Sequence, residues 1–116
     1  VADADKRIER CRDAIQNKDF ELLAETIEMD CNMMHAVMMT STPSLFYWTP
    51  ATLEIISAVR AWRKTGIPAA YTIDAGPNVH VICESAAAET VSAKLSKVPG
   101  VKELVVAHPG GAARLI

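Results

Sequence analysis

The segment at residues 74–78, with the sequence DAGPN, constrains the fold of this chain more than any other stretch. The runs on either side, residues 69–74 and 79–84, contain the β-branched and aromatic side chains that favour strands. Pro77 has no backbone donor, so the pairing of the two strands cannot continue through it. Gly76 permits a positive φ or the close approach of a ligand. Because a simple hairpin more often has a shorter turn, this joint predicts two antiparallel strands connected by a loop with a further use.

Three helices are predicted before this hairpin, because apolar residues recur at helical spacing. Their expected ranges are 4–17, 20–39 and 50–65. Asp19 is expected to cap the second helix, and Thr49 followed by Pro50 is expected to begin the third. Beyond residue 29 the second helix is apolar nearly all round, which predicts burial on most sides. The side chains expected to face the core are Phe20, Leu23, Ala24, Ile27, Cys31, Met34, Met38, Leu53, Ile56, Val59 and Trp62.

The remainder of the chain predicts one more helix and two more strands. The expected ranges are a helix at 86–97, a strand at 101–107 and an edge strand at 113–116. At 116 residues, 50% of them hydrophobic, the chain is long enough for a single domain, residues 1–116, with its own core. We therefore predict the α+β class, with a small, mainly antiparallel sheet and helices packed on one face.

A line of polar residues follows one face of the second predicted helix. Its members are three or four positions apart: Glu21, Glu25, Glu28, Asn32 and His35. The three glutamates are expected to be solvated. Asn32 and His35 lie among apolar residues, and a lone histidine in such surroundings is typical of a hydrogen-bonded core residue.

Composition argues against several functional classes. The net charge of -2 gives no reason to expect binding to nucleic acid or to an anionic membrane. The basic cluster of Arg60, Arg63 and Lys64 is expected to form a solvated helix end that complements the helix dipole. No apolar run approaches the ~20 residues of a membrane span, and no signal peptide is visible, so we expect a cytoplasmic protein. The cysteines show no metal-ligand spacing, so reduced thiols and no metal site are expected.

Asp74 is the candidate catalytic residue. From the residues alone, it is either a turn aspartate that accepts backbone hydrogen bonds or a carboxylate at the mouth of a cleft. In the second case it could accept a proton or stabilise a developing positive charge. Ala75 and Gly76 would then shape the same wall of the cleft.

Three segments in register carry a resemblance to a known family: YTIDAGPNV at residues 71–79, NMMHA at 32–36 and TPSLFY at 42–47. Together they resemble the diphosphomevalonate decarboxylases, members of the GHMP kinase superfamily. The resemblance covers nearly the whole chain but only the C-terminal half of such an enzyme. It implies the ferredoxin-like fold of the GHMP C-terminal domain.

The resemblance also implies an activity and its residues. The enzymes of this family are ATP-dependent carboxy-lyases that convert mevalonate 5-diphosphate to isopentenyl diphosphate, ADP, phosphate and CO2 in isoprenoid biosynthesis. Asp74 corresponds to their catalytic carboxylate, and Ala75, Gly76 and His35 correspond to positions expected to contact substrate. ATP with Mg2+ is expected to bind mainly to an N-terminal GHMP domain outside this chain, so the chain alone should be inactive. A homodimer is a further expected partner.

Two alternatives stay open at this point. The same fold could act on mevalonate 5-phosphate, because the groups that read the second phosphate are expected in the N-terminal half. The chain could also be a non-catalytic α+β binding or regulatory module. That reading predicts a covered surface beside Asp74, whereas the enzyme reading predicts an exposed apolar surface left by the partner domain.

Overall fold

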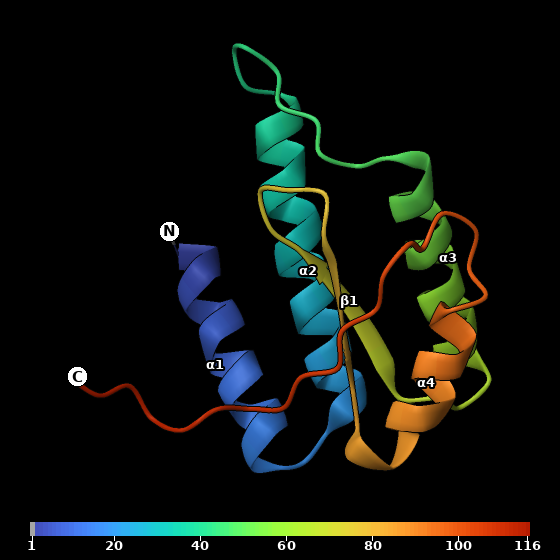
Figure 1. Ribbon diagram of the computed structural model, residues 1–116. Coiled ribbons are helices and arrows are strands. Elements are labelled where there is room, and N and C mark those ends of the chain that lie inside the picture. The colour runs from blue at the N-terminus through green and yellow to red at the C-terminus, as the bar shows by residue number, and fades with distance from the viewer. Residues whose placement is uncertain (1) are drawn as a thin grey trace.

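The computed structural model describes residues 2–116 and confirms the α+β class (Figure 1). Four helices, one 3-10 turn and two strands follow one another in the described chain. Their bounds are α1 (Ala2–Gln16), α2 (Phe20–Met39), α3 (Pro50–Lys64), β1 (Ala69–Ile73), β2 (Val79–Cys83), η1 (Ser85–Ala87) and α4 (Ala88–Leu95). The helices and the hairpin therefore lie close to their predicted ranges.

The helix ends are formed by the residues that the sequence predicts. The Asp19 carboxylate accepts a hydrogen bond from a backbone N–H of the first turn of α2. Thr49 and Thr52 form a reciprocal capping box at the start of α3, with Pro50 in the first helical position. Gly66 follows α3 with a φ of +95°, a conformation that glycine adopts without strain.

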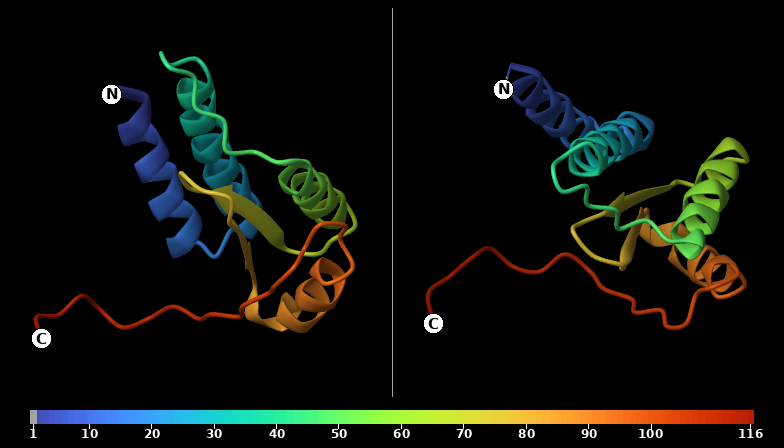
Figure 2. Two further views of the ribbon diagram at one scale, coloured as in Figure 1. Left: turned by 45° about the horizontal axis from the view of Figure 1, so that its top comes forward. Right: turned by 90° about the horizontal axis from the view of Figure 1, so that it is seen from above.

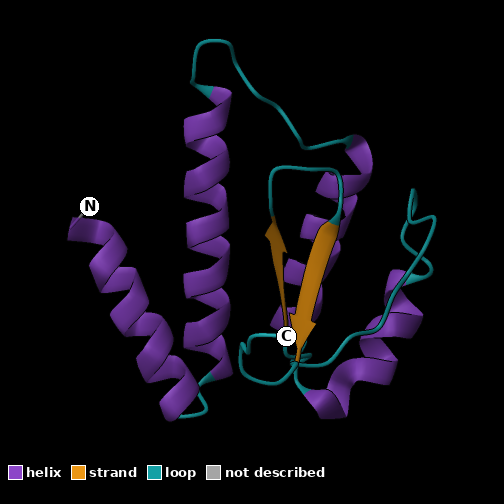
Figure 3. Cartoon of the chain, turned by 60° about the vertical axis from the view of Figure 1, so that its left-hand side comes forward, coloured by secondary structure: helices purple, strands orange, loops and turns teal. Residues whose placement is uncertain are grey.

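The two strands form an antiparallel hairpin in which Ala69 pairs with Cys83 and Ile73 pairs with Val79. Residues 74–78 therefore close the hairpin at one end, as predicted. The hairpin lies between the pair α1 and α2 and the pair α3 and α4 (Figure 2). Helix α2 runs along β1 in the same direction as the strand (Figure 3).

The core lies between β1 and helices α2, α3 and α4. Its buried members are Cys31, Ile56, Val59, Ala69, Tyr71, Ile73 and Val91. Leu53 and Met34 were predicted to face the core but are exposed. The side chain that α3 buries is Thr52 instead of Leu53, and those that α2 buries are Cys31 and His35 instead of Met34. The predicted burial of the second half of α2 on most sides is also wrong, since Met29 and Met33 are 49% and 42% exposed.

The two predicted strands at 101–107 and 113–116 do not form. Residues 101–116 contain no helix or strand and extend away from α4 (Figures 1 and 2). Val105 is 78% exposed. An apolar run becomes a strand only where it pairs with the backbone of a neighbour, and in the described chain β1 and β2 pair only with each other.

Candidate functional site

The Asp74 loop leaves β1 beside the C-terminal half of α2 (Figures 1 and 3). Asp74 is exposed, and its backbone carbonyl accepts a hydrogen bond of 2.9 Å from the Gly76 N–H. Within residues 2–116 its carboxylate forms no hydrogen bond or ion pair, so the loop backbone does not use the carboxylate oxygens. The side chain at this strand end is open to an incoming group.

Gly76 lies two positions further along the same loop. Its φ is not in the positive range, so the expected backbone requirement for glycine is absent here. A Cβ placed on Gly76 would meet no atom within 4 Å, so packing inside the described chain does not exclude a side chain either. Of the two reasons that the sequence suggested for a glycine, only the approach of a ligand stays as a prediction.

Ile73, the residue before Asp74, is held by two side chains of α2. The His35 Nε2 lies 2.7 Å from the Ile73 carbonyl oxygen, and the Ile73 N–H donates to the Cys31 Sγ over 3.2 Å. Since a carbonyl oxygen only accepts, His35 Nε2 carries a proton. Burial raises the pKa of the Cys31 thiol, which keeps it neutral near pH 7.

His35 is 1% exposed, so it lies beneath the Asp74 loop rather than at its surface. The core-histidine interpretation of the sequence describes its environment well. The rings of Tyr47 and Trp48 lie 6.4 Å and 5.3 Å from its ring centroid. Of the aromatic residues at 46–48, Trp48 packs on the core while Phe46 is 66% exposed. His35 therefore connects α2, the loop that contains Tyr47 and Trp48, and the end of β1.

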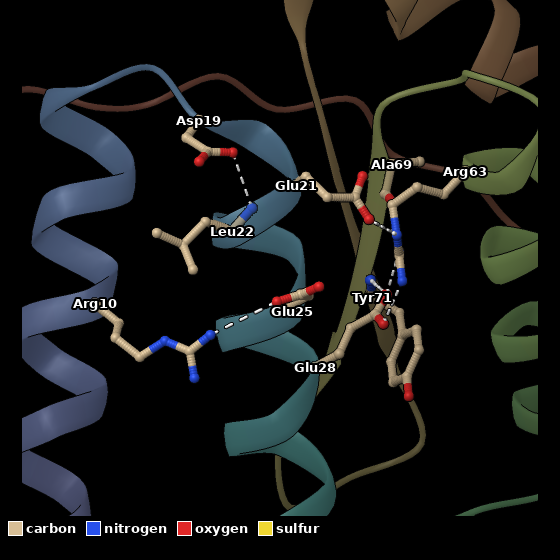
Figure 4. Close-up of polar contacts among 9 residues, drawn as sticks. All are labelled: Arg10, Asp19, Glu21, Leu22, Glu25, Glu28, Arg63, Ala69 and Tyr71. Carbon is tan, nitrogen blue, oxygen red and sulfur yellow. Dashed lines mark hydrogen bonds and ion pairs between the residues drawn. The ribbon is translucent and has the colours of Figure 1, made fainter.

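A buried ion pair beside β1 was not predicted from the sequence. Arg63 donates two hydrogen bonds to the Glu28 carboxylate, at 2.6 Å and 2.7 Å, and a third of 2.9 Å to the Ala69 carbonyl (Figure 4). The Tyr71 N–H also points to Glu28, at 3.4 Å. The predictions that Glu28 and Arg63 are solvated are therefore wrong, since their side chains are only 10% and 14% exposed.

These contacts share one physical cause. The edge of β1 that does not face β2 presents unpaired backbone groups at Ala69, Tyr71 and Ile73, and such groups need partners when they are buried. The polar line of α2 together with Arg63 supplies those partners. The signal in the sequence was the continuation of this polar line into an apolar part of the helix, at Asn32 and His35. Asn32 is itself used, because it accepts a hydrogen bond of 3.1 Å from the Tyr71 hydroxyl.

Two features typical of metal and nucleotide sites are absent from the described residues. No group of three or more His, Cys, Asp or Glu side chains within residues 2–116 could hold a metal ion. None of the five glycines stands just before a helix, where a phosphate-binding loop would place them. The three cysteines are free thiols. No helix in the described part of the chain is long and apolar enough to cross a membrane.

Comparisons with known proteins agree with the fold. The diphosphomevalonate decarboxylase of Candida albicans is 36% identical over 117 residues, which cover 96% of this chain and 32% of that protein. The phosphomevalonate decarboxylase of Haloferax volcanii is 32% identical over 76 residues, covering 65% of this chain and 24% of that protein. The chain thus spans about a third or less of the length of these relatives.

A solved structure supports the fold as well. It is described as MDDEF in complex with MVAPP, AMPPCP and magnesium, and it matches with a TM-score of 0.76 and 36% identity over 83% of this chain and 30% of that chain. The family described as "Mevalonate 5-diphosphate decarboxylase C-terminal domain" matches residues 2–108. The predicted resemblance is therefore confirmed, and the chain belongs to the mevalonate 5-diphosphate decarboxylase C-terminal domain family.

Proposed function

We propose that residues 1–116 form the C-terminal part of an ATP-dependent decarboxylase that converts mevalonate 5-diphosphate to isopentenyl diphosphate, with Asp74 as its catalytic carboxylate. The observation that carries this proposal is the exposed Asp74 side chain, which no described residue engages, on a strand end that α2 holds in place. The family membership supplies the reaction.

A free carboxylate at this position has two uses in such a reaction. It accepts or orients the proton of the tertiary 3-hydroxyl of the substrate, and it stabilises the positive charge that develops at that carbon. Ala75 and Gly76 form the adjacent wall. Because a side chain at Gly76 would meet nothing in this chain, we attribute the glycine to the approach of the substrate.

The rest of the protein is proposed to supply what this chain lacks. The described residues form no phosphate loop and no metal cluster, so we place the site for ATP and Mg2+ on an N-terminal GHMP domain. A related structure that contains AMPPCP and magnesium supports such a site in the family. Exposed apolar side chains on α2 and the following loop are the proposed docking surface for that domain: Met29, Met33, Met34, Val37, Leu45 and Phe46.

A second candidate substrate is mevalonate 5-phosphate. The observation in its favour is the relative from Haloferax volcanii, which is named a phosphomevalonate decarboxylase. The groups that distinguish one phosphate from two are expected outside this chain, so an activity assay with each substrate must decide between them. A preference for the diphosphate of tenfold or more in kcat/KM would support the main proposal.

The test uses the complete protein with ATP, Mg2+ and each substrate, and measures release of CO2. Asp74→Asn removes the charge and the proton acceptor with little change in shape. We expect kcat to fall by about 10³-fold, within the range that a positioned acid–base group contributes. Glu84→Gln is the matched control, because Glu84 is an exposed carboxylate just beyond the opposite end of the hairpin. Near-normal turnover by Asp74→Asn would overturn the catalytic assignment.

A further inference from the structure

The backbone of Ile73 is held by α2 and not by the other strand. Ile73 is 1% exposed, and both of its backbone polar groups end on α2: its carbonyl on His35 Nε2 at 2.7 Å and its N–H on Cys31 Sγ at 3.2 Å. These groups point away from β2, so the pairing of Ile73 with Val79 does not hold this peptide.

A fixed carbonyl of Ile73 also fixes the start of Asp74. The peptide bond is planar, so the Ile73 carbonyl oxygen lies in one plane with the backbone nitrogen and the Cα of Asp74. The hydrogen bond from His35 therefore fixes the orientation of the peptide plane that contains the Cα of Asp74, and with it the direction in which the Asp74 side chain projects. The Asp74 carboxylate has no partner of its own within residues 2–116, so its direction depends on this plane and on the bond from the Gly76 N–H.

The imidazole of His35 is itself held on several sides. It is 1% exposed, and the rings of Tyr47 and Trp48 lie against it at centroid distances of 6.4 Å and 5.3 Å. Packing of this kind keeps a side chain in one rotamer, which is what the support of a reactive group needs.

We propose that His35 is a positioning residue, which aims the Asp74 carboxylate through the Ile73 carbonyl, with Cys31 holding the other side of the same residue. This inference rests on the proposed role of Asp74. It gives His35 an indirect function in place of contact with substrate. Misplacement of a reacting group by about 1 Å lowers the rate by about 10²-fold, so a lost clamp acts mainly on kcat.

The test compares two substitutions of similar length in the complete protein. His35→Met removes the donor to Ile73, whereas His35→Gln keeps an N–H donor near the position of Nε2. We expect His35→Met to lower kcat by about 10- to 100-fold with KM changed by less than about threefold, and His35→Gln to recover most of that loss. Equal losses of kcat in both variants would overturn the proposal, because the donor would then not matter.

Two further variants keep the test decisive if His35→Met does not fold. Cys31→Ala removes the acceptor of the Ile73 N–H and is expected to lower kcat in the same way. Val91→Ala is the matched stability control. Val91 is 3% exposed in α4, and its apolar side chain forms no hydrogen bond to Ile73. It should lower the melting temperature without lowering kcat.

The outcomes separate this inference from the proposed function. If Asp74→Asn is inactive while His35→Met and Cys31→Ala turn over like the wild type, the positioning role is overturned and the catalytic role of Asp74 stands. If Asp74→Asn is active, the proposed function itself is overturned. A loss of kcat in Val91→Ala as large as that in Cys31→Ala would show a general effect of stability and would also overturn the positioning role.

Discussion

Arg63 of α3 and Glu28 of α2 form a two-bonded ion pair that closes the free edge of β1, with N–O distances of 2.6 Å and 2.7 Å. The same pair binds backbone groups on that edge, since Arg63 donates to the Ala69 carbonyl and Glu28 lies 3.4 Å from the Tyr71 N–H. The carboxylate is the largest cause of the raised pKa of Arg63. This interaction thus joins two helices and a strand that are distant in sequence.

We expect removal of one partner of this pair to destabilise the fold strongly. Arg63→Met leaves the Glu28 carboxylate buried without a cation and the Ala69 carbonyl without its donor. Breaking a buried pair in this way costs about 3–5 kcal/mol. The measurement is the free energy of unfolding from urea titration. The double variant Glu28→Met with Arg63→Met should recover part of the loss, because no unpaired charge is then buried.

An exposed ion pair in the same protein is the control for this experiment. Arg10 and Glu25 approach to 3.6 Å, with side chains 46% and 57% exposed. Pairs of this kind contribute less than about 1 kcal/mol, so Arg10→Met should change the free energy of unfolding little. A similar effect of Arg10→Met and Arg63→Met would contradict the special role of the buried pair.

The local parts of this fold were predictable from the sequence because their causes are local. The cap at Asp19, the start of α3 at Thr49 and the loop at 74–78 depend on residues a few positions apart. The strand predicted at 101–107 failed because a strand also needs a partner backbone, which an apolar pattern does not report.

The exposed part of the candidate site was predictable from the sequence, but the buried contacts that hold it in place were not. Asp74 was predicted to be the catalytic residue from its own loop and from the resemblance, and the structure shows that its side chain is exposed. The burial of Glu28 and Arg63 was missed because charged residues at helical spacing are usually solvated, and only the position of β1 reverses that expectation. The distance of 38 residues between His35 and Ile73 placed their hydrogen bond beyond pattern analysis.

Gly76→Ala separates activity from stability at the Asp74 loop. The φ of Gly76 is not positive and a Cβ would meet nothing within 4 Å, so the free energy of unfolding should change by less than about 0.5 kcal/mol. If substrate approaches the loop at this position, kcat/KM in the complete protein should fall by about tenfold or more. Unchanged kcat/KM would show that the wall of the site lies elsewhere.

Gly100→Ala is the contrasting substitution. Gly100 has a φ of +87°, and a Cβ there would lie 2.6 Å from the Cβ of Ala51. We expect a loss of stability of more than about 1 kcal/mol, measured by urea titration, from the strained backbone and the clash together. Activity per folded molecule should stay normal, because Gly100 follows α4 and is not part of the Asp74 loop. A variant as stable as the wild type would contradict the close approach of these two residues.

Stability should fall as the pH rises into the alkaline range. Burial raises the pKa of the Cys31 thiol above its ordinary value of 9.0, and it also raises the pKa of Cys83 and of the Tyr71 hydroxyl. The unfolded chain therefore loses these protons at lower pH than the folded chain does. The stabilisation is fully present below about pH 9 and is lost as the pH rises toward the folded-state values. The urea midpoint measured between pH 7 and 10 should decline, and Cys31→Ser should decline less steeply.

Self-association of the isolated chain tests the proposed docking surface on α2. Val37 and Phe46 are 68% and 66% exposed, and large apolar side chains exposed on a monomer are often covered by a partner. If an N-terminal domain covers them in the complete protein, residues 1–116 alone should form dimers or larger species at micromolar concentrations, measured by analytical ultracentrifugation. The double variant Val37→Lys with Phe46→Lys should be monomeric. Ile8→Lys, on an exposed face of α1, is the control and should still associate; a monomer from Ile8→Lys alone would place the contact on α1 and contradict the proposed surface.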